Sequence, residues 1–142
     1  MKKSRILITT PIYYVNDKPH LGHAFTTLIA DVLSRYFKQQ GKEVFFLTGT
    51  DEHGIKIAQL SEEQNKTPQE LCDEISLEFK KTWQNSGIEY DYFIRTTDKD
   101  HIETVQFILN TLKETNNLYE KDYEGLYCVG CESFLLEKDL VN

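Results

Sequence analysis

The sequence predicts an α/β fold with a parallel sheet, and three features support this. A short apolar run at residues 6–8 is long enough for a buried strand, and a second run occupies residues 43–48. Between them, apolar residues recur at the spacing of one helix face: Leu21, Phe25, Leu28, Ile29, Val32, Leu33 and Tyr36. Strand, helix and strand in this order form a βαβ unit, whose strands are parallel with a right-handed crossover.

The boundaries of this unit follow from local signals. The first strand is expected over residues 5–10, because Pro11 cannot continue a central ladder. The first helix is expected to end before Gly41, since glycine is common just past a helix end. The second strand then runs over residues 43–48 and is followed by a polar segment.

Two helices are expected next. The first covers residues 55–64. The second starts at Thr67, which supplies an N-cap, with Pro68 in the first turn and Glu70 completing a capping box. Its core face is an apolar stripe made of Leu71, Ile75, Phe79 and Trp83.

The last part of the chain changes character. Residues 90–95 predict a third strand, and Thr97 is expected to cap a final helix. The apolar face of that helix consists of Ile102, Val105, Leu109 and Leu112. From Asn116 onward, charged, aromatic and glycine residues surround two cysteines, which favours short antiparallel strands of a different unit within residues 118–136.

A phosphate site is predicted where the first strand leads into the first helix. A helix N-terminus offers unpaired N–H groups and a partial positive charge, which suit an anion. His20 and His23 lie three residues apart, on one side of the first turn, and can donate hydrogen bonds to that anion. Gly22 keeps side-chain bulk away from it.

A second group of polar residues follows the second strand. Residues 49–54 read Gly-Thr-Asp-Glu-His-Gly and include Asp51 and His53. In an open parallel sheet, ligands bind beyond the carboxyl ends of the strands. Residues 9–14 and 49–54 both lie at such ends, so we expect them to face one crevice. Tyr13 is expected either to pack against the sheet or to join Tyr14 in the site.

Composition narrows the function classes. A net charge of −7 argues against a broad nucleic-acid-binding face. Cys72 lies beside apolar residues on a helix face and is expected in the core, whereas Cys128 and Cys131 have the spacing of metal ligands. Three cysteines do not make a disulfide framework, which favours a reducing compartment. With neither a signal peptide nor a membrane span in the sequence, we expect a cytoplasmic protein without a membrane partner.

Four segments together resemble the N-terminal part of methionyl-tRNA synthetases, which belong to the class I aminoacyl-tRNA synthetases. Residues 19–23, Pro-His-Leu-Gly-His, are similar to the "HIGH" motif of that class. Residues 9–16 are similar to the segment before that motif, and residues 46–54 to the next strand-end loop. Residues 125–132 are similar to the start of the zinc-bearing insertion. The segments occur in the family's order, which makes the resemblance more specific than any single motif.

The resemblance implies a fold and a domain organisation. Residues 1–115 would form the first half of a Rossmann-type parallel-sheet nucleotide-binding domain. Residues 116–142 would begin the zinc-binding connective-peptide insertion, with Cys128 and Cys131 as two of four Zn²⁺ ligands.

The resemblance also implies a reaction. Methionine would be activated by ATP with Mg²⁺ to methionyl-adenylate, and the methionyl group would pass to tRNA(Met). By position, His20 and His23 would be catalytic and would bind ATP together with Gly22. The methionine-binding residues would be Ile12, Tyr14 and Asp51, with the Asp51 carboxylate holding the ammonium group. DNA is not an expected partner, and most tRNA contacts would lie outside this segment.

Some parts of that family are not found in the sequence. A lysine loop of the "KMSKS" type, the second half of the sheet and an anticodon-binding domain are missing. We therefore expect a fragment that does not aminoacylate alone and that is marginally stable or self-associates through its exposed sheet.

Three other functions stay open on the residues alone. One is another nucleotidyltransferase with a His-x-Gly-His motif. A second is a zinc-dependent hydrolase that uses His20, His23, Asp51 and His53. A third is a non-catalytic zinc or tRNA-binding module, which the acidic composition disfavours.

Overall fold

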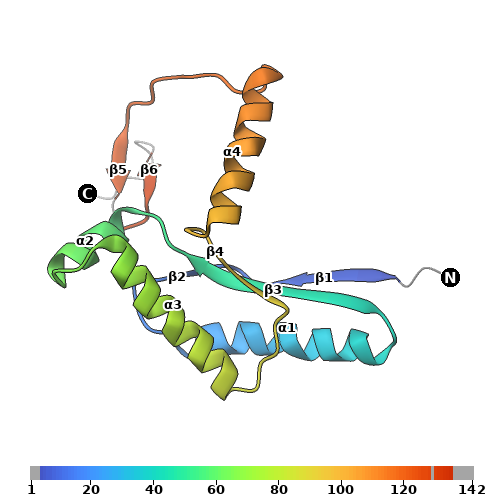
Figure 1. Cartoon of the computed structure of the whole chain (residues 1–142). Helices are drawn as coiled ribbons and strands as arrows, with labels where there is room; N and C mark the ends of the chain where they lie inside the picture. Colours follow the sequence, from blue (N-terminus) through green and yellow to red (C-terminus); the bar gives the residue numbers. More distant parts are fainter. Residues whose placement is uncertain (1–3, 129, 136–142) are drawn as a thin grey trace. The chain divides into compact units, whose positions relative to one another are not determined.

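The computed structural model describes residues 4–128 and 130–135 (Figure 1). The chain forms two compact units, Met1–His101 and Ile102–Asn142. The division into domains at residue 115 stays a prediction. Among the described residues, no helix combines the length and the apolar character that a membrane span requires.

The first unit is built on a parallel sheet centred on β3. Its elements, in chain order, are β1 (Arg5–Thr9), β2 (Tyr13–Tyr14), α1 (Leu21–Gln39), β3 (Glu43–Asp51), α2 (Ile55–Glu63), α3 (Pro68–Asn85) and β4 (Tyr92–Arg95). β3 pairs in parallel with β1, β2 and β4. Leu47 is opposite both Thr9 and Tyr92, so β1 and β4 occupy opposite edges of β3. The predicted parallel βαβ unit is confirmed, and β2 adds a short strand after Pro11 that the sequence analysis did not predict.

The local signals at the start of α3 and at the end of α1 act as the sequence predicts. Thr67 is the N-cap of α3, with its hydroxyl accepting from the Glu70 N–H and the Glu70 carboxylate accepting from the Thr67 N–H. Pro68 is the first residue of that helix. Gly41 follows α1 with φ +73°, a backbone conformation that glycine adopts without strain.

The core of the first unit lies between the sheet and α3. The stripe predicted on α3 is buried, and Phe79 and Trp83 have no exposed surface. Phe46 of β3 and Val15 are equally buried and belong to the same cluster. Cys72 also lies in this cluster, in agreement with its expected core position.

The apolar stripe on α1 points away from this core. Its members are exposed, including Phe25 at 64% and Val32 at 57%. The buried face of α1 is instead small and polar and consists of Thr27, Ala30, Asp31 and Ser34. Asp31 accepts hydrogen bonds from Arg35 Nε at 2.7 Å and from the Glu89 N–H at 2.9 Å. Polar contacts thus join the buried face of α1 to the rest of the unit.

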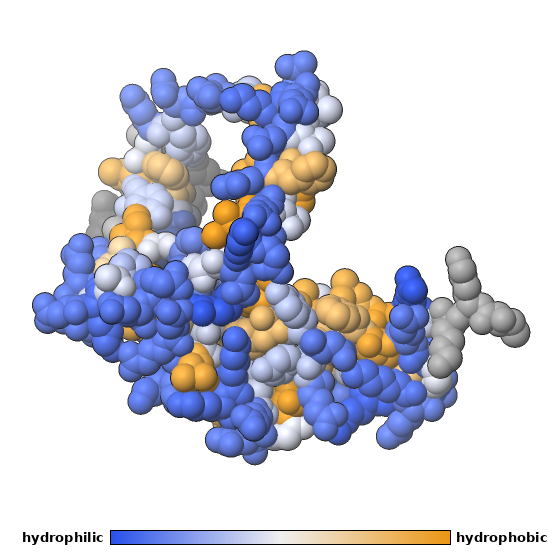
Figure 2. All heavy atoms as spheres, viewed as in Figure 1, coloured by the Kyte–Doolittle hydropathy of each residue, from blue (hydrophilic) through white to orange (hydrophobic). Residues whose placement is uncertain are grey.

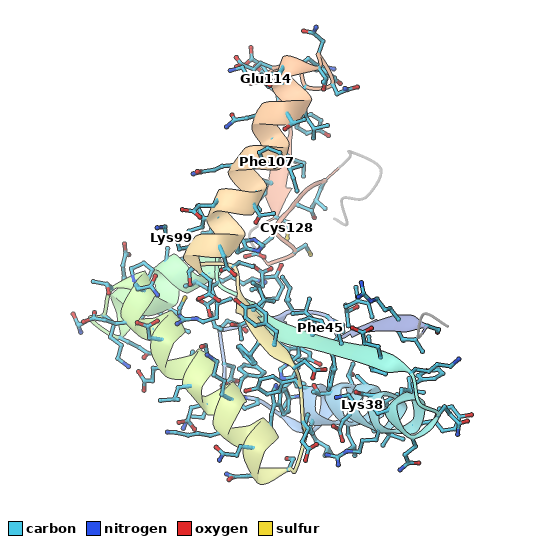
Figure 3. All side chains as sticks on the ribbon, turned by 45° about the vertical axis from the view of Figure 1, so that its right-hand side comes forward. Lys38, Phe45, Lys99, Phe107, Glu114 and Cys128 are labelled. Carbon is cyan, nitrogen blue, oxygen red and sulfur yellow. The ribbon has the colours of Figure 1, made fainter. Side chains whose placement is uncertain are left out.

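A second apolar surface lies on the sheet. Side chains alternate along a strand, so Phe45 stands on the face opposite the buried Phe46 and is 48% exposed. Leu7 on β1 is 65% exposed. Figure 2 shows hydrophobic side chains along β1 and β3. Figure 3 labels Phe45 and also Lys38 on α1, whose Nζ lies 3.4 Å from the Asp91 carboxylate.

The second unit contains most of α4 (Lys99–Glu114) and a hairpin of β5 (Leu126–Cys128) and β6 (Ser133–Leu135). The hairpin is antiparallel, as the sequence predicts, and Tyr127 is opposite Phe134. Their ring centroids are 5.2 Å apart in an edge-to-face arrangement.

Candidate active site

Two histidines form the N-terminal cap of α1. His20 is the N-cap residue, with an extended backbone at φ −120° and ψ 175°. Its Nδ1 accepts the Gly22 N–H at 3.1 Å, and the His23 Nδ1 accepts the His20 N–H at 3.3 Å. The two imidazoles thus do the work that Ser or Thr and Glu do in an ordinary capping box.

This cap fixes the tautomer of both rings. A neutral imidazole whose Nδ1 accepts a hydrogen bond carries its proton on Nε2. His20 and His23 therefore each keep one Nε2–H to donate to a ligand. Their rings stack with centroids 3.6 Å apart and planes 22° apart, so the two donors lie side by side in one group.

The surroundings of His23 favour its neutral form. Its ring lies 4.8 Å from the Tyr13 ring and 5.3 Å from the Phe79 ring, measured between centroids. Burial is the main cause that lowers the pKa of His23, and the neighbouring His20 lowers it further, while Asp17 acts in the opposite direction. A Cβ on Gly22 would lie 2.9 Å from His20 Cε1, so a larger residue there would displace the capping ring.

Tyr13 and Tyr14 have different places. Tyr13 is buried and its hydroxyl lies 2.8 Å from Thr27 Oγ1, so Tyr13 packs under the site. Tyr14 is half exposed and is paired in register with Asp51 across β2 and β3. Register partners in a parallel pair point to the same face, so the structure brings Tyr14 and Asp51 together. Ile12, just before them, is 41% exposed.

The sheet links the two groups of candidate residues. Tyr13, which packs on His23, is paired with Thr50, the residue before Asp51. The imidazoles therefore lie on the Tyr13 face and Asp51 on the Tyr14 face, both at the carboxyl end of β2 and β3. Within the described part of the chain, the Asp51 carboxylate has neither a hydrogen bond nor an ion pair.

Comparison with known proteins shows the family of this chain. The model of the family described as tRNA synthetases class I (M) matches residues 6–141. The chain belongs to this family. It is 53% identical over 135 residues to a methionine–tRNA ligase of Campylobacter jejuni, covering 95% of this chain and 22% of that protein. A methionine–tRNA ligase of Thermotoga maritima is 50% identical over 137 residues, with 96% and 22% covered.

A solved structure shows the same fold. The Mycobacterium tuberculosis methionyl-tRNA synthetase in complex with methionyl-adenylate matches with a TM-score of 0.88 and 35% identity. The match covers 97% of this chain and 27% of that one. The parallel sheet and its helices are thus part of the Rossmann-type catalytic domain of class I synthetases. The chain spans about a fifth of the length of the curated relatives it matches.

The chain also contains a buried charged pair that the motifs did not indicate. Glu52 is 3% exposed and pairs with Arg95 of β4 at 2.7 Å between Oε1 and Nε. Thr97 donates to Glu52 Oε2 at 2.5 Å. Thr97 was expected to cap the last helix, but α4 begins at Lys99 and this hydroxyl faces Glu52 instead. The sequence indicates this pair only through Glu52, a charged residue inside the strand-end motif. Nothing in the sequence points to Arg95 as its distant partner.

His53 is tied to the same region. Its Nε2 lies 3.2 Å from the Thr96 carbonyl oxygen, so the position of the His53 ring is explained without a bound ligand. Gly54, the next residue, has φ +130° and turns the chain into α2. Only glycine adopts this conformation without strain, so Gly54 sets the end of the loop.

The two cysteines of the hairpin lie at its turn. The Cys131 N–H donates a hydrogen bond to Cys128 Sγ at 3.4 Å. In residues 4–128 and 130–135, no three His, Cys, Asp or Glu side chains are grouped closely enough to hold a metal ion. A structural zinc site takes four ligands, so this pair fits half of one.

Proposed function

We propose that this segment supplies the ATP and methionine sites of a methionine–tRNA ligase. The enzyme activates L-methionine with ATP and Mg²⁺ to methionyl-adenylate and transfers the methionyl group to tRNA(Met). The observation that carries the proposal is the stacked His20–His23 pair at the start of α1, in a chain about half identical to methionine–tRNA ligases. The tRNA contacts are assigned to parts of the enzyme beyond this segment.

The histidine pair suits the first half-reaction. The methionine carboxylate attacks the α-phosphate of ATP and pyrophosphate leaves, so negative charge builds up on phosphate oxygens. His20 and His23 each donate an Nε2–H there, and the α1 N-terminus adds its partial positive charge. Because the capping bonds already hold both rings, they need little reorganisation during the reaction. Gly22 keeps the approach to the phosphates open.

The other face of β2 and β3 suits methionine. Asp51 has a carboxylate with no protein partner in the described part of the chain, so it can pair with the ammonium group. Tyr14 stands beside it in register and offers an aromatic wall, and Ile12 adds an aliphatic one. Methionine needs a carboxylate partner and apolar walls, because its ammonium group is charged and its side chain is apolar and flexible.

Cys128 and Cys131 are proposed to hold a structural Zn²⁺ together with two further ligands. The metal-ligand spacing of the two cysteines supports this, and a bound metal requires both as thiolates. The ion would fix the hairpin and would take no part in the reaction. Reduced thiols are typical of the cytoplasm, where we place the enzyme.

The test is methionine-dependent exchange of pyrophosphate with ATP by the full-length enzyme. His20→Ala and His23→Ala should each lower kcat by about 100-fold, the usual effect of losing one transition-state donor. His101→Ala, in α4, is the matched control and should stay within about twofold of the wild type. The proposal is contradicted if exchange does not depend on methionine, or if the His20→Ala and His23→Ala enzymes exchange pyrophosphate as fast as the wild type.

A further inference from the structure

A buried ion pair lies directly under the loop that carries Asp51. The side chain of Glu52 has no exposed surface, and that of Arg95 is 16% exposed. Glu52 Oε1 accepts hydrogen bonds from Arg95 Nε at 2.7 Å and from Thr50 Oγ1 at 2.6 Å. Its Oε2 accepts from Thr97 Oγ1 at 2.5 Å. Both carboxylate oxygens are therefore satisfied by fixed donors from β3, β4 and the residues after β4.

The backbone of the loop is tied down as well. The Glu52 N–H donates to Thr96 Oγ1 at 2.8 Å, and the His53 ring lies 3.2 Å from the Thr96 carbonyl oxygen. Arg95 continues the network to α3, where its Nη2 lies 2.6 Å from Asp73 Oδ1. The hydrogen bond to Glu52 is the largest cause that raises the pKa of Arg95. Glu52 thus joins three elements that are distant in the sequence.

Burying a charge is costly unless it is paired, and such a pair adds little net stability over apolar packing. What a buried pair can supply is a single defined conformation. This matters here because the Asp51 carboxylate has neither a hydrogen bond nor an ion pair of its own among the described residues. The direction of the Asp51 side chain is therefore set by the neighbouring backbone. Glu52 turns inward, so its neighbour Asp51 must turn outward.

We propose that Glu52 and Arg95 are positioning residues for the amino-acid site, which hold the Asp51 carboxylate where it meets the ammonium group of the substrate. The inference rests on the proposed function. Glu52 and Arg95 touch no substrate; they act through Asp51. The interaction they support is with the amino acid, whereas the histidine pair that faces ATP is held by its own cap on α1. Losing the Glu52–Arg95 pair should therefore raise KM for methionine and have little effect on KM for ATP.

The chain offers a matched control. Asp31 is also a buried carboxylate, 3% exposed, and also accepts from an arginine Nε at 2.7 Å, that of Arg35. It receives one backbone N–H, from Glu89. Losing its charge removes the same kind of interaction, but on α1 and away from Asp51. The comparison separates general loss of stability from loss of position.

The experiment measures KM for methionine and KM for ATP in pyrophosphate exchange by the full-length enzyme. Glu52→Gln should raise KM for methionine at least about tenfold and leave KM for ATP within about twofold. Arg95→Lys keeps the positive charge but loses the planar guanidinium that donates to both Glu52 and Asp73, so it should raise KM for methionine as well. Asp31→Asn should lower the urea midpoint and change neither KM.

Two outcomes overturn the inference: an unchanged KM for methionine in Glu52→Gln, or an equal rise in both KM values. If Glu52→Gln does not fold, Thr97→Val removes one hydroxyl donor and should raise KM for methionine about threefold; an unchanged value refutes the positioning role. A wild-type enzyme without methionine-dependent exchange would instead refute the proposed function itself.

Discussion

Substitution of Gly49 by alanine should strongly destabilise the first unit. Gly49 lies in β3 opposite Ile94 of β4. A Cβ on Gly49 would come 2.0 Å from the Ile94 carbonyl oxygen and 2.6 Å from its Cγ2. The first of these atoms is backbone, which cannot rotate away, so one strand has to move by more than 1 Å, roughly, to reach ordinary contact distance.

The magnitude follows from what that movement disrupts. Overpacking a well-packed site costs about 1–3 kcal/mol. Separation of β3 from β4 also weakens about two backbone hydrogen bonds, each with a net value near 1 kcal/mol. The sum is about 3–5 kcal/mol, a large part of the stability of a typical domain. Since Ile94 precedes Arg95, the same displacement should loosen the pair with Glu52.

The assay is urea unfolding of the chain, with midpoints and slopes compared for each variant. Gly87→Ala is the control. Gly87 has φ +67° but nothing lies within 4 Å of a Cβ there, so its substitution carries only the backbone penalty of about 1–2 kcal/mol. A Gly49→Ala chain that is as stable as Gly87→Ala would refute the steric argument.

Two further predictions concern His23 and its support. Tyr13→Phe removes the hydroxyl that bonds Thr27 at 2.8 Å but keeps the ring against His23, so it should cost about 1 kcal/mol in urea unfolding and leave exchange activity within about twofold; a large loss of activity would show that the hydroxyl itself acts on the substrate. Because the pKa of His23 is lowered from 6.5 in the folded chain, the unfolded chain binds its proton first, and urea midpoints should fall as the pH drops below about 6.5. His23→Asn should flatten that pH dependence, and an unchanged slope would contradict it.

The sequence by itself determined most of the helices and strands and the candidate motifs. Strand runs, the cap at Thr67 and the glycine after α1 are local signals, because each depends on residues within one or two helical turns. The motif around His20 and His23 and the motif around Asp51 could be recognised for the same reason. That the chain is marginally stable or self-associates remains a prediction, as do its zinc ligands.

Tertiary structure alone decided how those pieces support one another. The pattern on α1 shows an apolar stripe, yet the helix buries its polar face, where Asp31 accepts a hydrogen bond from the Glu89 N–H, 58 residues away. Arg95 becomes the partner of Glu52 only when β4 pairs with β3, and Gly49 becomes indispensable only through the Ile94 carbonyl across the same pair. Helix caps and motifs depend on neighbouring residues and can be recognised in the sequence. The buried Glu52–Arg95 pair and the close approach of Gly49 to Ile94 depend on strands that meet only after folding.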